Sequence, residues 1–232
     1  DEVFGEIAGS YAEYVVAKEK SLANKPTNAS FEEAAGVPLA GFTALQGLRD
    51  HGQVEAGDKV LVIGASGSVG TWTVQIANVM GAEVTAVCST VNVEAAKELG
   101  AVTVVDYTQQ DFTKLDRQFD VIIDIVGDRK LAQCRDLLVE GGRYVMVSGP
   151  KRKLLGPVGR MLAAKIVFMR HSQKFVWFVA NVNVDDLEYL GNLVEEGKIA
   201  TRIERTYALN EVPEAMLYLG EGHAKAKLII TV

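Results

Sequence analysis

One stretch, residues 59–81, constrains the fold of this chain more than any other. Residues 59–63 are a short run of mostly branched apolar side chains, typical of a strand buried on both faces of a sheet. Three glycines at a spacing of three come next, and a helical pattern follows them. A strand, a tight glycine turn and a helix N-terminus together direct several unpaired backbone N–H groups at one point. The stretch therefore predicts an anion site of the kind that binds a dinucleotide pyrophosphate.

The glycine turn supplies the first group of candidate cofactor-binding residues. They are Gly64, Ser66, Gly67, Ser68, Val69 and Gly70. The glycine spacing by itself is a weak indication of a nucleotide site, and its place between a strand and a helix gives it weight. The competing interpretation is a glycine turn that belongs to a strand–helix unit and binds no ligand. The turn alone leaves both open.

Composition narrows the class of partner and the compartment. The 232 residues fit one large domain or two modest ones, and 48% apolar with 23% charged residues is typical of a soluble globular chain. The net charge of −6 argues against nucleic acid as the main partner. Cys88 and Cys134 lie too far apart for a metal or redox motif. No apolar run approaches the roughly 18 residues of a membrane span. Because no signal peptide is recognisable either, we expect a cytoplasmic protein in a reducing compartment.

The pattern after the glycine turn alternates strands with helices. The predicted strands cover 83–87, 102–105, 119–125 and 143–147, and the predicted helices cover 93–99 and 129–138. Such alternation predicts an α/β fold built on a doubly wound parallel sheet, the Rossmann arrangement. A sheet of this kind presents its ligand at the carboxyl ends of the strands.

The segments that flank this alternation predict shorter elements. Residues 1–18 predict two short strands, at 1–5 and 11–16. Ser30 and Glu33 form a capping-box signature that begins a helix. The other predicted elements are helices over 40–49, 185–196 and 210–219, the last capped by Asn210, and strands over 201–207 and 226–232.

The segment 151–184 stands apart by its charge. It holds seven cationic residues and no Asp or Glu, and these are Lys151, Arg152, Lys153, Arg160, Lys165, Arg170 and Lys174. One interpretation is a partly buried helix and strand whose long cationic side chains extend over apolar surface. The alternatives are a wall of the substrate pocket and a patch that contacts an anionic membrane.

The end of the second predicted strand indicates which nucleotide the site prefers. NAD sites carry an acidic residue about twenty positions past the glycine turn, where it binds the ribose 2′-hydroxyl. Here residues 87–92 offer two hydroxyls and an amide but no carboxylate. Ser89 and Thr90 can hydrogen-bond a 2′-phosphate that a carboxylate would repel, so NADP(H) is favoured. Lys97, about one helical turn on, is the candidate cation. An ordinary strand-end cap is the competing interpretation for the two hydroxyls.

Several motifs occur in the order and at the spacings of a known superfamily. They are Gly5 with Gly9–Tyr14, residues 31–45, Gly64–Gly70, Cys88–Thr90, and Leu99–Ala101 with Asp106–Tyr107. In these motifs the chain resembles the medium-chain dehydrogenase/reductase superfamily over essentially its whole length. The last three of these motifs resemble its zinc-independent quinone and enone reductase branch. Two further features are similar to the zinc-free members. Only five residues separate Gly5 from Tyr11, where zinc enzymes carry a four-cysteine lobe, and Ala40 stands where they place a zinc-ligating cysteine. The resemblance therefore implies no metal site.

The resemblance implies a two-part organisation. Residues 41–180 correspond to the Rossmann dinucleotide-binding domain, and residues 1–40 to a remnant of the GroES-like β domain. Residues 181–232 would close the Rossmann sheet and return to the GroES-like domain. Family members have several dozen residues before the motif at Asp1. We therefore expect this chain to lack most of the GroES-like barrel, which supplies part of the substrate wall.

The resemblance also implies an activity, the transfer of hydride from NADPH to a quinone, an enone or a related carbonyl substrate. Around the pyrophosphate it implies the backbone N–H groups of Ser68 and Val69. Around the 2′-phosphate and the adenosine it implies Ser89, Thr90, Lys97 and Tyr107. Around the nicotinamide it implies Thr43, Val126, Gly127, Ser148 and Gly149. No catalytic residue is assigned. A homodimer is expected from the family only, and the alternative function is a truncated NADP(H)-binding module without turnover.

Overall fold

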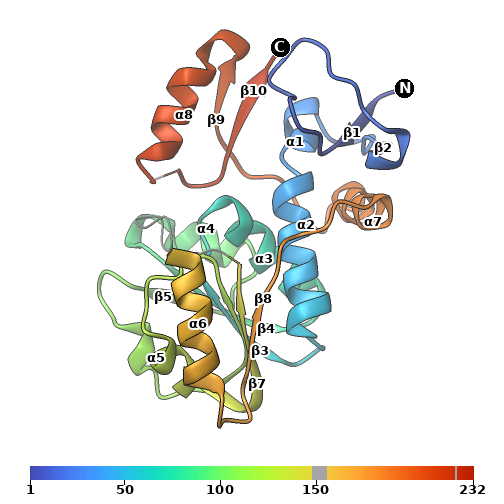
Figure 1. The fold of residues 1–232 in the computed structure, drawn as a ribbon. Helices are drawn as coiled ribbons and strands as arrows, with labels where there is room; N and C mark the ends of the chain where they lie inside the picture. Colours follow the sequence, from blue (N-terminus) through green and yellow to red (C-terminus); the bar gives the residue numbers. More distant parts are fainter. Residues whose placement is uncertain (148–155, 223) are drawn as a thin grey trace.

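A six-stranded parallel sheet forms the centre of the molecule (Figure 1). The structure is a computed structural model that describes residues 1–147, 156–222 and 224–232. The strands are β3 Lys59–Ile63, β4 Glu83–Cys88, β5 Thr103–Asp106, β6 Phe119–Asp124, β7 Leu138–Met146 and β8 Lys174–Trp177. Their order in the sheet is β5-β4-β3-β6-β7-β8, so the chain moves outward from β3 to β5 and then returns to place β6 on the other side of β3. This is the strand order of a Rossmann fold, and the predicted fold class is confirmed.

Both faces of the sheet are buried, because successive side chains of a strand point to opposite sides. Val60 and Val62 join one core, which also holds side chains of the helices on that face. Leu61 and Ile63 join a second core on the opposite face. The first core is covered by α2 Pro38–Gln46, α3 Ser68–Val79 and α4 Val93–Glu98, and the second by α5 Leu131–Asp136 and α6 Gly156–Phe168. The sheet is therefore doubly wound, as the continuous apolar runs of its strands predict.

A smaller lobe lies at one end of the sheet, beyond the point where α6 begins (Figure 1). Its strands β1 Val3–Gly5 and β2 Leu22–Asn24 pair antiparallel, and β9 Ile203–Ala208 and β10 Lys227–Thr231 pair in parallel. Its helices are α1 Phe31–Ala35, α7 Val184–Glu195 and α8 Val212–Gly220. Helix α2 runs from this lobe along the sheet (Figure 1). Among the described residues, no helix is both long enough and apolar enough to cross a membrane.

The local sequence signals at the helix starts are largely confirmed. Ser30 Oγ accepts from the backbone N–H of Glu33 at 3.2 Å, and Glu33 Oε2 accepts from the N–H of Ser30 at 2.8 Å, which completes the capping box. Helix α2 begins at Pro38 rather than at residue 40, because proline fits the first turn of a helix. After Gln46 the chain continues as a π-helical turn, Gly47–Gly52.

One predicted strand is absent, and the starts of two other predicted elements differ from the prediction. Residues 11–16 form no strand, and Tyr14 and Val16 are 91% and 95% exposed. Their alternating pattern finds no neighbouring strand, and β propensity needs such a neighbour. Strand β7 begins at Leu138, five residues before the predicted start, because its first part pairs with Phe119 across an irregular register. Asn210 caps no helix, since it lies inside the 3₁₀ turn Leu209–Glu211 that precedes α8.

The expectation that residues 181–232 close the central sheet is also wrong for the strands. The sheet ends at β8, and the two later strands pair with each other instead. Helix α7 packs against α2 and against β2 of the smaller lobe. The predicted boundaries of the domains stay a prediction.

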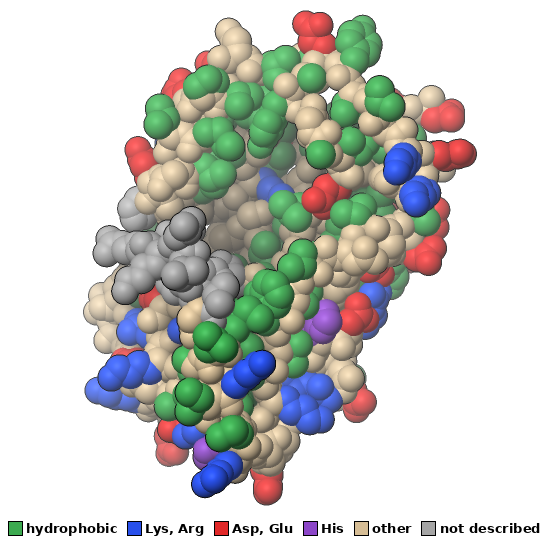
Figure 2. All heavy atoms as spheres, viewed as in Figure 1, with side chains coloured by type: hydrophobic (Ala, Val, Ile, Leu, Met, Phe, Trp, Pro, Cys, Tyr) green, Lys and Arg blue, Asp and Glu red, His purple; other side chains and the backbone are tan. Residues whose placement is uncertain are grey.

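The cationic segment contains a partly buried helix and strand, as one interpretation holds. Phe168 at the end of α6 and Phe178 after β8 are buried. The exposed cations of this segment include Lys165, Arg170 and Lys174. Hydrophobic side chains also gather on the surface over α6 and β8 (Figure 2). Contact of this face with a membrane stays a prediction.

Candidate cofactor site

The glycine turn between β3 and α3 is shaped by two close approaches. Gly64 has φ +89°, and a Cβ on it would stand 2.7 Å from Cγ2 of Val126. A Cβ on Gly70 would stand 2.1 Å from the carbonyl oxygen of Gly64, so no larger residue fits there. A Cβ on Gly67 would lie 3.7 Å from its nearest neighbour, which is ordinary contact. Gly64 and Gly70 are thus fixed by geometry, and Gly67 is not.

The N-terminus of α3 presents free donors at this turn. The helix begins at Ser68, and the N–H groups of Ser68, Val69 and Gly70 have no acceptor within the helix, because the first turn has no preceding carbonyls. The N-cap is Gly67, whose lack of a side chain leaves these donors uncapped from that position. Twelve helical residues add a partial positive charge at this end. The geometry fits a pyrophosphate.

The turn lies where the strand order reverses. Ser66 and its neighbours follow β3, and the N–H groups of Gly64 and Ala65 are anchored on the carbonyl oxygen of Val87 in β4, at 3.2 and 3.1 Å. On the other side of β3, Val126 and Gly127 follow β6. Figure 2 shows the surface hollowed between the sheet with its helices and the smaller lobe. In an open parallel sheet this reversal is where a dinucleotide binds.

Thr43 lies on α2, which packs against α3. Its Oγ1 donates to the carbonyl oxygen of Leu39 at 2.7 Å, so its proton is used within its own helix. Ser148 and Gly149 lie outside the described residues. Of the residues predicted to surround the nicotinamide, the structure therefore describes Thr43, Val126 and Gly127.

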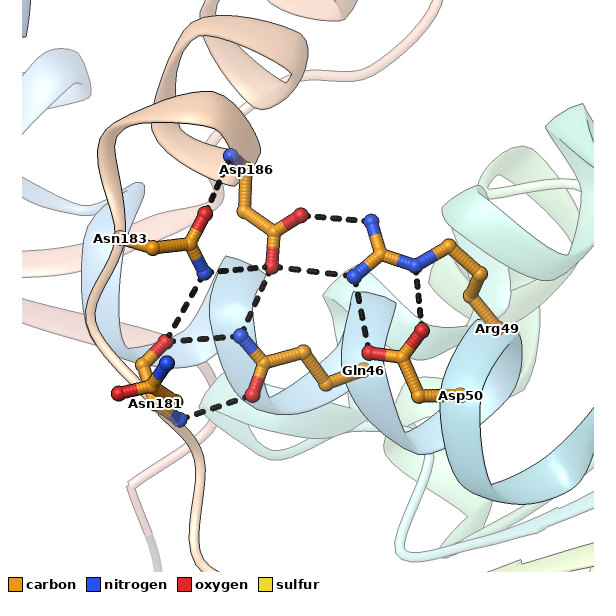
Figure 3. Close-up of polar contacts among 6 residues, drawn as sticks. All are labelled: Gln46, Arg49, Asp50, Asn181, Asn183 and Asp186. Atoms are coloured by element: carbon orange, nitrogen blue, oxygen red, sulfur yellow. Dashed lines mark hydrogen bonds and ion pairs between the residues drawn. The ribbon is translucent and has the colours of Figure 1, made fainter.

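The orientation of α2 is fixed by a polar network around the buried side chains of Gln46 and Asp186 (Figure 3). Gln46 donates to Asp186 Oδ2 at 2.8 Å and exchanges two hydrogen bonds with the backbone of Asn181, both at 2.8 Å. Arg49 Nη1 lies 2.6 Å from Asp186 Oδ1. Burial alone would raise the pKa of Asp186, but hydrogen bonds from Arg49, Asn183 and Gln46 outweigh it and lower that pKa. The network ties the helix that carries Thr43 to the start of α7.

One of the residues predicted to bind the 2′-phosphate contacts a carboxylate that the sequence analysis did not include in the site. Thr90 Oγ1 donates to Asp106 Oδ2 at 2.6 Å and lies 2.9 Å from Thr108 Oγ1. The hydroxyl of Thr90 is the main cause that lowers the pKa of Asp106. Asp106 is the last residue of β5 and pairs in register with Cys88 of β4. The signal was present in the sequence, because neighbouring parallel strands end at the same edge of a sheet.

The other residues predicted to bind the 2′-phosphate and the adenosine each have a different hydrogen-bond partner. Ser89 Oγ accepts from Asn92 Nδ2 at 3.0 Å, which leaves its own proton free to donate. Lys97 Nζ lies 2.8 Å from Glu94 Oε1, and both side chains are largely exposed. Tyr107 is 51% exposed, and its N–H donates to the carbonyl oxygen of Cys88 at 3.0 Å. The structure thus brings Ser89, Thr90 and Tyr107 to one edge of the sheet.

Comparisons with known proteins agree with this geometry. A family model described as "Zinc-binding dehydrogenase" matches residues 99–230. The quinone oxidoreductase from Coxiella burnetii superimposes with a TM-score of 0.87 at 33% identity, over 99% of this chain and 71% of that one. The chain belongs to the medium-chain dehydrogenase/reductase superfamily.

Curated relatives place the chain within the superfamily. The mouse (Mus musculus) "NAD(P)H oxidoreductase RTN4IP1, mitochondrial" is 32% identical over 97% of this chain. The tomato (Solanum lycopersicum) "2-methylene-furan-3-one reductase" is 35% identical over 99% of it. The chain spans 61% and 57% of the lengths of these two relatives. Together with the quinone oxidoreductase above, they identify the zinc-independent quinone oxidoreductase branch of the superfamily, and the resemblance seen in the sequence is confirmed.

The described part of the chain contains no group of three or more His, Cys, Asp or Glu residues arranged to hold a metal ion. The relatives' names indicate a nicotinamide cofactor.

Proposed function

We propose that this chain binds NADPH and belongs to an oxidoreductase that transfers hydride to a quinone or an enone. One observation carries the proposal. The glycine turn and the uncapped N-terminus of α3 meet at the reversal of the strand order, beside Val126. Relatives named as quinone oxidoreductases and as an "NADPH-dependent alkenal/one oxidoreductase" support the substrate class.

Each part of the site has a task in this proposal. The N–H groups of Ser68 and Val69 bind the pyrophosphate, and Gly70 allows α3 to pack closely against the turn after β3. Thr43, Val126 and Gly127 flank the nicotinamide end. The bound nicotinamide would supply the hydride, and the protein orients it and excludes water around it.

The preference for NADPH over NADH is the finer part of the proposal. The absence of a carboxylate at positions 87–92 and the free proton of Ser89 support it. Thr90 is a poorer donor than its sequence position predicts, since a hydroxyl has one proton and Asp106 already accepts it. Lys97 reaches a phosphate only by leaving Glu94. Ser89 is therefore the principal hydroxyl donor in this proposal.

The first experiment titrates the purified chain with NADPH and with NADH and follows the nicotinamide fluorescence. A clear preference for NADPH supports the assignment of the 2′-phosphate group. Equal or tighter binding of NADH removes that assignment and leaves the dinucleotide site in place. Binding of neither nucleotide overturns the proposed function.

The second experiment measures the consumption of NADPH with a quinone and with an enone. Consumption with either supports the oxidoreductase. Binding of NADPH without consumption would instead identify a nucleotide-binding module without turnover, the alternative that the partial coverage of the curated relatives keeps open. Cytoplasmic location and a homodimer stay predictions, which fractionation and sedimentation would test.

A further inference from the structure

The buried carboxylate of Asp124 forms hydrogen bonds with the loop that follows β6. Asp124 is the last residue of β6 and is 1% exposed. Its Oδ1 accepts from the backbone N–H groups of Val126 and Gly127, at 3.0 and 2.8 Å. These two bonds fold the chain back on itself, and Gly127 takes φ +70° in that turn. One carboxylate oxygen is thus committed to the shape of the Val126–Gly127 loop.

The second oxygen of the same carboxylate is held from the far side. Tyr144 Oη donates to Asp124 Oδ2, and Arg160 Nη2 lies 3.3 Å from the same oxygen. Arg160 Nη2 also donates to Tyr144 Oη at 2.8 Å, and its Nη1 donates to the carbonyl oxygen of Arg129 at 2.7 Å. The three side chains come from β6, β7 and α6. Four donors therefore converge on one carboxylate.

This cluster lowers the stability of the fold unless all of its partners are present. The side chain of Arg160 is 11% exposed and that of Asp124 is 1% exposed, so neither charge is solvated well by water. A buried ion pair adds little net stability compared with apolar residues of the same volume, but removal of one partner leaves an unpaired buried charge. A network of this kind is better suited to fixing one arrangement of the backbone than to adding stability.

The loop that it fixes lies at the predicted nicotinamide end of the site. The side chain of Val126 approaches Gly64, the first glycine of the turn, closely enough that a Cβ there would clash with it. A shift of the loop would move Val126 relative to the pyrophosphate donors at the start of α3. The adenosine group around Ser89 and Thr90 lies at the end of β4, on the other side of β3.

We propose that Asp124, held by Arg160 and Tyr144, is a positioning residue that sets the Val126–Gly127 loop for the nicotinamide half of the cofactor. The proposal rests on the proposed nucleotide site and adds a task for residues that do not touch the ligand. It requires that disturbing the carboxylate weakens binding of the whole dinucleotide and spares binding of the adenosine half.

The test compares two variants that are both free of the buried charge. In Asp124→Asn/Arg160→Met the amide oxygen still accepts from the loop N–H groups. In Asp124→Ala/Arg160→Met that acceptor is gone. The probes are NADPH and 2′,5′-ADP, which lacks the nicotinamide half. We expect the alanine pair to bind NADPH about tenfold more weakly than the asparagine pair, the effect of losing hydrogen bonds to a buried loop. Both should bind 2′,5′-ADP equally.

Two further variants separate positioning from general stability. Tyr144→Phe removes one donor to Asp124 and keeps the ring contacts with Phe168 and Phe175. It should weaken NADPH binding and leave 2′,5′-ADP binding unchanged. Arg160→Lys keeps a cation and should bind NADPH more tightly than Arg160→Met. If Arg160 only fills space in the core, Arg160→Lys should bind NADPH no more tightly than Arg160→Met.

The outcomes that overturn the proposal are distinct from failure of the proposed function. Equal binding of NADPH by the asparagine and alanine pairs contradicts it, and so does a parallel loss of NADPH and 2′,5′-ADP. If the unmodified chain binds neither probe, the nucleotide site itself is wrong. If it binds 2′,5′-ADP and NADPH with the same affinity, the nicotinamide half makes no contact, and the positioning role is overturned.

Discussion

Thr90 Oγ1 lies 2.6 Å from Asp106 Oδ2, so the hydroxyl predicted to bind a 2′-phosphate donates to a carboxylate instead. The pairing of β4 with β5 brings these residues together from sixteen positions apart in the sequence. The negative charge of Asp106 therefore lies beside the hydroxyl groups that are expected to bind the negatively charged 2′-phosphate. The preference of the site for NADPH or NADH therefore depends on the repulsion between Asp106 and the 2′-phosphate.

Asp106→Asn should shift the preference toward NADPH. The variant removes a like charge near the 2′-phosphate and keeps an oxygen that can accept from Thr90. Because Asp106 is only half-buried, at the end of the edge strand β5, we expect a modest tightening of NADPH binding of about threefold, with NADH binding unchanged. Fluorescence titration with both nucleotides measures it, and the effect should shrink at high salt. An equal change for both nucleotides would place the phosphate elsewhere.

Ser89→Ala should weaken NADPH binding more than Thr90→Val does. Ser89 has a free proton, whereas the proton of Thr90 is shared with Asp106. We expect a loss of about tenfold for Ser89→Ala with NADPH, the effect of one hydrogen bond to a charged group, and little change with NADH. The reverse ranking would show that Thr90 releases Asp106 when the nucleotide binds.

Gly70→Ala should abolish nucleotide binding, and Gly67→Ala should be tolerated. The added methyl at position 70 would stand 2.1 Å from the backbone oxygen of Gly64, whereas at position 67 it would have 3.7 Å of space. Relief of the clash must move α3 from β3, at a cost of about 1–3 kcal/mol in the free energy of unfolding. Urea unfolding and NADPH titration of the two variants give a matched comparison. Similar behaviour of both variants would contradict this geometry.

Asp186→Asn should loosen α2 and make the chain less sensitive to acid. The variant loses the charged partner of Arg49, which we expect to lower the free energy of unfolding by about 1–3 kcal/mol. The pKa of Asp186 is lower in the folded state than in the unfolded chain. Its stabilisation is therefore present above the unfolded value of about 4 and is lost as the pH falls through the folded value. Urea midpoints between neutral and acidic pH should fall less in the variant than in the parent.

The two thiols should be unreactive until the chain unfolds. Burial, with a smaller contribution from Asp106, raises the pKa of Cys88 to about 11. Burial, with a smaller contribution from Asp124, raises the pKa of Cys134 to about 12. A thiol-specific reagent at mildly alkaline pH should therefore label both cysteines in urea and neither in the native chain over the same time. Rapid native labelling would contradict the burial of these side chains.

The same shifts predict a loss of stability at high pH. An unfolded cysteine ionises near pH 8.5, well below the folded values. The preference for the neutral folded thiols is complete below about pH 8.5 and is lost as the pH rises through about 11 to 12. Thermal unfolding of Cys88→Ala, followed from neutral to alkaline pH, should show a shallower fall than that of the parent chain.

The sequence predicted the doubly wound parallel sheet and the glycine turn, but not the bounds of its last strand, β8. Buried parallel strands need no polar alternation, so the composition of the run 59–63 predicts a strand, and the close approach of Gly70 to Gly64 in the turn after it is a contact six positions apart. It also indicated the superfamily, because the motifs keep their order and spacing along the chain. The roles of the individual site residues stay predictions.

Only the tertiary structure decided which polar groups share a site. Asp106 reaches Thr90 because β4 and β5 are neighbours in the sheet, and Arg160 reaches Asp124 because α6 packs on the sheet, over a separation that no local pattern encodes. For the same reason residues 11–16 carry a strand pattern and form no strand, since a strand is stable only beside a neighbour. Local sequence sets what each segment can be, and long-range packing sets which charges and hydrogen-bond donors it meets.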